Sequence, residues 1–228
     1  GVLFRHPHAT DPQIMIGAVV DATCDKIPLQ VGQYESGLEI EGSFENVVIE
    51  SGGGGQNTES YELALYTLAR HTVTDAWEKR GKKGYAFLIG DEHAYPYVNA
   101  TEVNKVFGEN IQSNIPLQNI ILEVQKKWNL FFIIPLNASN GSSPLLLKFW
   151  RDLLGQNVIE LDDASAVAET IAMTVGLCEG TTDRDGARRD LVDEGLDAVA
   201  ATNATKSLVV GTASSKVATV VGSSSRRL

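Results

Sequence analysis

Two short loops carry the residue types best suited to binding a ligand. The first is a run of four glycines that leads through polar residues into a helix, SGGGGQNTESYELA at residues 51–64. Glycine is usually kept where φ must be positive or where the backbone approaches another group closely. The second loop, Gly90-Asp91-Glu92, is acidic. Together they predict a ligand site at the ends of strands, with oxygen groups that suit a hard cation.

The helix after the glycines is expected to begin beside this site. Thr58 is the predicted N-cap, and Glu59 and Glu62 place negative charge in the first turn, where the helix dipole favours it. A phosphate-binding loop is the alternative, but the motif GxxxxGK[ST] is absent, and Gly81-Lys82 precedes a predicted strand instead of following one. The sequence therefore argues against a nucleotide ligand.

Alternating strands and helices must position these loops. Apolar runs bounded by turn residues predict strands at residues 14–20, 85–89, 130–134 and 158–161, each buried on both faces, and a short edge strand at 29–34. Apolar residues at helical spacing predict helices at residues 59–71, 116–128, 144–154 and 165–177. This alternation predicts an α/β fold: a mostly parallel sheet with helices on both faces, whose ligands bind at the carboxyl ends of the strands.

Composition limits the number of domains and the classes of binding partner. We expect one α/β domain over residues 1–178, followed at 179–228 by a charged helix and a tail rich in Ser, Ala and Val. The chain has 19 basic and 29 acidic residues and a net charge of −10, which opposes binding to nucleic acid or to anionic membranes. Its two cysteines, Cys24 and Cys178, indicate no disulfide framework, and a reducing cytoplasm is the simpler inference.

Several segments, in the same order, resemble von Willebrand factor A (VWA) domains, in particular the bacterial and kinase-associated branch. They are IGAVVDATCD at 16–25, GGGGQNTES at 52–60, GYAFLIGDE at 84–92, NLFFIIP at 129–135 and LGQNVIELDDASAVAETIAMTV at 154–175. The resemblance implies a Rossmann-like sheet and a metal ion-dependent adhesion site at its strand-end edge. In that family a partner's acidic side chain often completes the coordination of Mg²⁺ or another divalent cation.

Carried over by position, the resemblance implies a metal site at Asp91, Gln56 and Thr58. Asp91 matches the aspartate of the third metal loop, and Gln56, with Thr58 beside it, takes the second-loop position. The DxSxS motif of the family's first strand is missing, and Gln56 is neutral where the related branch has an acid. We therefore expect cation binding by this chain alone to be weak or absent.

The missing first strand also has a consequence for the sheet. In the family it lies between the strands that here are 14–20 and 85–89, so the resemblance implies an N-terminally incomplete domain. Two unpaired ladders inside a core are not tolerated, so an upstream segment, another chain or the tail must fill the gap. Residues 208–215 in the tail weakly resemble the missing strand. We nevertheless expect deletion of 206–228 to leave the folding of the domain nearly unchanged.

The resemblance favours a protein-binding module that acts at the strand-end edge, with or without a divalent cation. We expect the partner to contact residues of the two loops and the aromatic segment beyond them: Gly54, Gly55, Glu92, His93, Tyr95 and Tyr97. One alternative is a structural or assembly subunit with a degenerate metal site. The other is a metal-assisted hydrolase using Asp91, Glu92 and His93, for which the sequence offers no set of nucleophile, base and orienting group. We therefore do not expect an enzyme.

Overall fold

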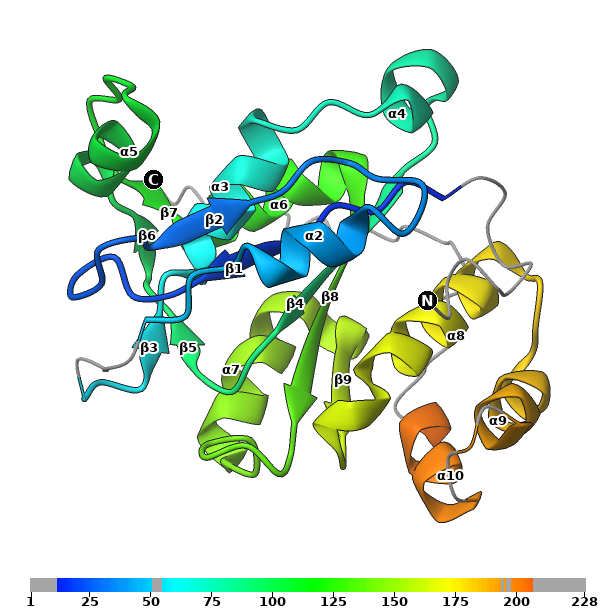
Figure 1. Cartoon of the computed structure of the whole chain (residues 1–228). Helices are drawn as coiled ribbons and strands as arrows, with labels where there is room; N and C mark the ends of the chain where they lie inside the picture. The colour runs from blue at the N-terminus through cyan, green and yellow to red at the C-terminus, as the bar shows by residue number, and fades with distance from the viewer. Residues whose placement is uncertain (1–11, 51–54, 194, 196–197, 207–228) are drawn as a thin grey trace, which may run out of the picture.

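A parallel three-stranded sheet forms the centre of the protein. The computed structural model describes residues 12–50, 55–193, 195 and 198–206. The strands are β4 (Gly84–Ile89), β8 (Trp128–Pro135) and β9 (Val158–Leu161), in the order β4-β8-β9. Their register pairs Gly84 with Trp128 and Phe132 with Val158, so all three carboxyl ends lie at one edge of the sheet (Figure 1).

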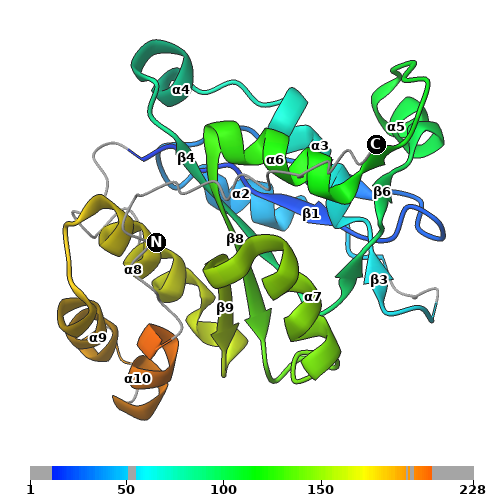
Figure 2. The same ribbon diagram turned by 180° about the vertical axis from the view of Figure 1, so that it is seen from behind.

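Helices cover both faces of this sheet, as its apolar strands require. On one face, α3 (Tyr61–Arg70), α6 (Leu117–Lys127) and α7 (Pro144–Leu154) pack against alternate residues of the strands, such as Leu88 and Phe132 (Figure 2). On the other face, α8 (Val167–Glu179), α9 (Arg184–Asp193) and α10 (Ala198–Lys206) pack against the intervening residues, such as Phe131 and Ile133 (Figure 1). The α/β prediction is confirmed at this level.

Shorter elements surround the sheet. Three two-stranded pairs are present in the described residues: β1 (Gly17–Val19) with β2 (Leu29–Val31), β3 (Thr58–Glu59) with β5 (His93–Ala94), and β6 (Tyr97–Val98) with β7 (Ile115–Pro116). The remaining helices of the described residues are α2 (Ile40–Glu45), α4 (Asp75–Arg80) and α5 (Ala100–Phe107), together with the 3₁₀ turns η1 (Gly155–Asn157) and η2 (Ala164–Ala166). No helix in the described part of the chain is both long and apolar enough to span a bilayer.

The prediction of a doubly buried parallel strand at residues 14–20 is wrong. Only Gly17–Val19 form a strand, which pairs antiparallel with Leu29–Val31, and none of its three residues is buried. The cause is the short connection of residues 20–28, because such a connection joins antiparallel neighbours, whereas a parallel pair needs a long crossover. The apolar run therefore lies in a partly exposed hairpin outside the central sheet.

The second neighbour expected for β4 is not found among the described residues. There, β4 pairs with β8 alone, and β1 contacts α3 instead of extending the sheet. The tail segment 208–215 and the glycines 52–54, which include the expected contact Gly54, lie outside the described residues. The described part of β4 is thus an edge strand.

Candidate functional site

Three loops meet at the carboxyl-end edge of β4, and Asp21 joins them. Asp21 follows β1 and is only 3% exposed. Its Oδ1 accepts hydrogen bonds from the amide and hydroxyl of Thr23, both at 2.8 Å. The hydroxyl of Tyr95 donates to the same carboxylate, 3.1 Å from Oδ1 and 3.0 Å from Oδ2, and Nε2 of Gln56 donates to Oδ2. One carboxylate therefore connects the loops 20–25, 55–60 and 90–95.

The environment of Asp21 keeps its side chain ionised. Burial alone would raise its pKa, but the hydrogen bonds from Thr23, Tyr95 and Gln56 outweigh burial and lower the pKa below its usual value. Because these donors come from three separate loops, the charge of Asp21 is held by the tertiary structure. A neutral Asp21 would hold the three loops together less strongly.

We expect Tyr95→Phe to destabilise the protein by roughly 1–2 kcal/mol near neutral pH, because a hydroxyl that donates to an ionised, buried carboxylate is lost. The lowered pKa of Asp21 contributes stability above its unfolded pKa and loses it as pH falls through the folded value. The cost of the variant should therefore shrink at acidic pH. Urea unfolding at neutral and acidic pH measures it, and Tyr97→Phe, at a residue 50% exposed, is the control. Equal effects of the two variants would contradict the role of Tyr95.

The two loops singled out in the sequence are paired through their backbones. Thr58 lies opposite His93 and Glu59 opposite Ala94 in the β3–β5 pair, and the amide of His93 donates to the carbonyl of Asn57 at 3.2 Å. Gly55 has φ 76°, so positive φ is confirmed at the one loop glycine that is described. The predicted proximity of the glycine loop and the acidic loop is therefore confirmed.

The prediction that Thr58 caps the following helix is wrong. Thr58 and Glu59 belong to β3, and α3 begins two residues later, with Ser60 at the N-cap position. The hydroxyl of Ser60 accepts a hydrogen bond from the amide of Ala22 at 2.9 Å instead of capping the helix. Pairing with β5 holds Thr58 in an extended conformation, which keeps it out of the cap.

Two carboxyl groups at this edge, those of Glu59 and Glu92, have raised pKa values. Burial, and then the charges of Glu92, Asp21, Asp25 and Asp91, raise the pKa of Glu59 to about 7. Burial and the charges of Asp91 and Asp21 also raise the pKa of Glu92. One buried oxygen of Glu59 and one of Glu92, Oε2 in each, find no hydrogen-bond partner among the described residues. The edge is therefore electronegative.

Glu62 is a functional candidate of another kind, which the sequence indicated only as negative charge in the first turn of the helix. Its side chain is fully buried, and burial, only partly offset by the backbone amides of Glu62 and Tyr95, raises its pKa to about 8. At neutral pH this carboxyl group is therefore mostly protonated. Glu62 lies between Tyr61 and Leu63 in the first turn of α3, and all three side chains are buried.

The residues expected to bind a metal do not form a set of ligands. The amide group of Gln56 is bonded to Asp21, whereas Oδ2 of Asp91 accepts a hydrogen bond from the amide of Asn140 at 2.8 Å. Thr58 is fixed in β3. Within the described residues, no three His, Cys, Asp or Glu side chains are arranged to hold a metal ion. This arrangement does not fit the divalent cation that the VWA resemblance implies.

The three residues considered for hydrolysis also point to separate neighbours. Nδ1 of His93 lies 3.3 Å from the carbonyl of Asn57, and its ring packs edge-on against Phe149, with centroids 4.9 Å apart. Glu92 is held through its carbonyl, which accepts a hydrogen bond from the indole of Trp150 at 3.0 Å. None of the hydrogen bonds described for Asp91, Glu92 and His93 joins two of their side chains. The described hydrogen bonds therefore do not connect these three side chains into a relay.

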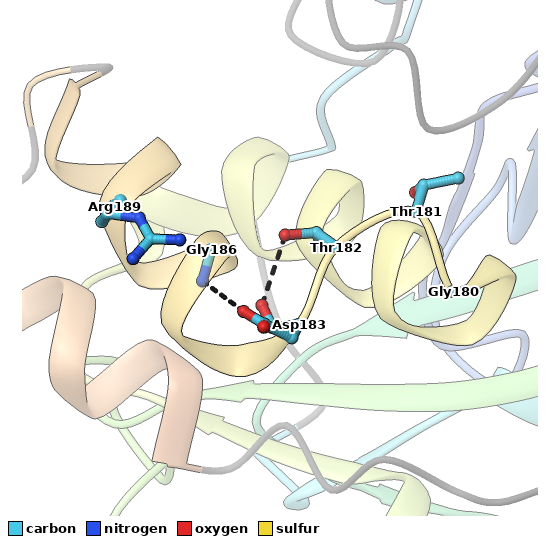
Figure 3. Close-up of a pocket in the computed structure, with 6 residues that line it drawn as sticks. All are labelled: Gly180, Thr181, Thr182, Asp183, Gly186 and Arg189. Carbon is cyan, nitrogen blue, oxygen red and sulfur yellow. Dashed lines mark hydrogen bonds between the residues drawn. The ribbon is translucent and has the colours of Figure 1, made fainter.

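A separate open hollow of about 420 Å³ lies at the turn between α8 and α9 (Figure 3). Gly180, Thr181, Thr182, Asp183, Gly186 and Arg189 line it, and none of these residues was predicted to bind. Oδ1 of Asp183 accepts a hydrogen bond from the amide of Gly186 at 2.7 Å, so this carboxylate already caps the start of α9. An anion at that helix end would meet the charge of Asp183, and we assign no ligand to the hollow.

Comparison with known proteins adds no further assignment. No protein-family model matches the chain, and neither a curated protein nor a solved structure matches it. The arrangement of the three loops around Asp21 is therefore the feature that bears on function.

Proposed function

We propose that this chain is a protein-binding module of the VWA type, which engages its partner at the carboxyl-end edge of β4. The observation that carries the proposal is the joining of three loops through Asp21, which presents their side chains together without needing a ligand. Pre-organised loops of this kind lower the entropic cost of binding. The VWA resemblance of these same segments supports both the module type and a Rossmann-like sheet order, which form part of the proposal.

The charge of the edge decides which partner group fits it. Asp21, Glu59, Asp91 and Glu92 influence one another electrostatically, so negative charge gathers at this edge. An acidic partner side chain would need a cation between it and this edge, and the residues described there are not arranged to hold one. A Lys or Arg side chain of the partner complements the edge directly, with Tyr97 exposed nearby in sequence as an apolar contact.

A peptide selection tests the site and the partner chemistry together. Peptides displayed in a random library and selected on the wild-type chain should carry Lys or Arg, and fluorescence anisotropy should show them binding equally well with EDTA or Mg²⁺. Glu59→Gln with Glu92→Gln should weaken binding at least about tenfold, because hydrogen bonds to charged groups are lost. Glu78→Gln, an exposed acid on α4, is the matched control.

Two outcomes would count against this assignment. Selected peptides that are acidic and need Mg²⁺ would restore the metal-mediated mode of the VWA family. If the affinity of the selected peptides is unchanged by Glu59→Gln with Glu92→Gln, the binding surface lies elsewhere on the chain.

A further inference from the structure

The outer edge of β4 has main-chain groups ready to pair with another strand. The amide of Gly90 donates to the carbonyl of Ile133 at 3.1 Å, so β4 uses Gly84, Ala86, Leu88 and Gly90 to bond β8. The N–H and C=O groups of the alternate residues, Tyr85, Phe87 and Ile89, point away from β8. Within the described residues no hydrogen bond to these groups is found, and β4 is the outer strand of the sheet (Figure 1).

This edge lacks the features that normally keep edge strands from pairing. Proteins protect such edges with charged side chains, proline, bulges or very short strands. The sequence of β4, GYAFLI, has no charge and no proline, and its six residues pair with β8 in unbroken register. Its last residue, Ile89, is 46% exposed. An unprotected apolar edge of this length indicates a surface that is covered in the functional state.

The charges that flank β4 fit a second copy of the same strand. Two lysines precede it and two acids follow it, in the segment KKGYAFLIGDE at 82–92. In an antiparallel pair that places Phe87 opposite the same residue of the second copy, Tyr85 faces Ile89 of the partner subunit. This register puts Lys83 opposite Asp91 of the partner subunit and Lys82 opposite Glu92 of the partner subunit.

The same register satisfies the free main-chain groups. All the outward-facing residues, Tyr85, Phe87 and Ile89, then fall in hydrogen-bonded pairs and make about six new hydrogen bonds. Aromatic and apolar side chains lie opposite one another, which also stabilises antiparallel pairs. Lys82 contacts Glu179 of its own chain but keeps 59% of its side chain exposed, so it stays within reach of the opposing subunit.

We propose that two copies of this chain pair antiparallel through their β4 edges, about a two-fold axis at Phe87, to form one continuous six-stranded sheet. Edge pairing alone is a small interface, so the dimer should have a dissociation constant on the order of 1–100 µM. Pairing through identical edges closes the assembly at two copies. The dimer contacts Asp91 and Glu92, which also belong to the proposed partner-binding edge, but it is tested by the mass of the assembly and not by peptide binding.

Sedimentation equilibrium of the full chain tests the proposal. The wild type should be a dimer at high micromolar concentration. Ile89→Pro should weaken it at least about 30-fold, because proline removes an outward N–H and its ring blocks the edge, while the ladder to β8 does not use that N–H. Ile89→Val keeps the N–H and should dimerise like the wild type. Circular dichroism checks that both variants are folded.

A second variant leaves the backbone untouched. Lys82→Glu with Lys83→Glu places like charges opposite Asp91 and Glu92 of the partner subunit, and should abolish the dimer at low salt. Two results would overturn the proposal directly: a monomer at about 0.5 mM, well above the expected dissociation constant, or a dimer that survives both Ile89→Pro and the lysine reversals. A third would be a full chain that stays monomeric while a chain truncated after residue 206 dimerises, since the tail would then cover β4.

Discussion

Glu62→Gln is expected to stabilise the protein at neutral and alkaline pH and to remove most of the pH dependence of its unfolding. The carboxyl of Glu62 is fully buried, and burial, only partly offset by the backbone amides of Glu62 and Tyr95, raises its pKa from 4.5 to about 8. Ionising it in the folded state therefore costs free energy that an unfolded chain does not pay. Glutamine has nearly the same shape and stays neutral, so it avoids this cost.

The sign follows from proton binding. Between pH 4.5 and about 8 the folded state holds a proton on Glu62 that the unfolded state has released, so raising the pH favours unfolding. The wild type should lose about 1.4 kcal/mol of unfolding free energy per pH unit from this group, and roughly 3–5 kcal/mol over the interval. Above the folded pKa the loss levels off. Glu59, with its pKa raised to about 7, adds a change of the same sign.

Urea unfolding of the wild type and Glu62→Gln at several pH values from about 5 to about 8.5 measures this effect. The two stability curves should lie close together at the acidic end and diverge as the pH rises. Glu78→Gln, on the exposed side of α4, should follow the wild type throughout. Parallel curves for Glu62→Gln and the wild type would show that Glu62 is not held protonated in the folded protein.

Gly90→Ala is expected to be the most damaging small substitution at the site. A Cβ on Gly90 would overlap the hydroxyl of Tyr61 and lie 2.8 Å from its Cζ. Tyr61 is 5% exposed and its ring packs edge-on against Phe132 and Trp150, with centroids 5.3 and 5.6 Å away, so it has little room to move. We expect a loss of roughly 2–3 kcal/mol from this overpacking.

A double variant separates the overlap from other effects of Gly90→Ala. Tyr61→Phe removes the hydroxyl that the new methyl group meets, so Gly90→Ala should cost less in the Tyr61→Phe background, by at least about 1 kcal/mol in a double-mutant cycle. Gly42→Ala is the control, because a Cβ there meets nothing within 4 Å and lies in α2, where alanine favours the helix. Additive costs for Gly90→Ala and Tyr61→Phe would show that the overlap is not the cause.

The central sheet and its helices were predictable because their signals are local. The apolar runs at residues 85–89, 130–134 and 158–161 correspond to β4, β8 and β9, and the helix predicted at 144–154 matches α7 at both ends. Long, uniform apolar runs and a proline at the start of α7 leave few alternatives. The hairpin of β1 and β2 was missed because three-residue strands are decided by their partner more than by their own sequence.

The site was predictable in part. The sequence placed the glycine loop and the acidic loop at one edge, and the β3–β5 pair joins them there. The network around Asp21 depends on contacts such as that between Asp21 and Tyr95, 74 residues apart, which no local pattern encodes. The burial of Glu62 was hidden for a similar reason, since a first-turn glutamate has the same helix-dipole benefit whether it is buried or exposed.

Asp21 also links the site to the stability of the whole N-terminal region. Only Asp21 and Pro28 are buried in residues 12–50, and apolar side chains such as Phe44, 64% exposed, and Ile49, 89% exposed, remain in solvent. A region with so little buried surface opens locally at low cost, while the rest of the fold stays intact. A partner that closes over the Asp21 network holds this region shut, so binding would be recorded as slower amide hydrogen exchange in residues that the partner never touches.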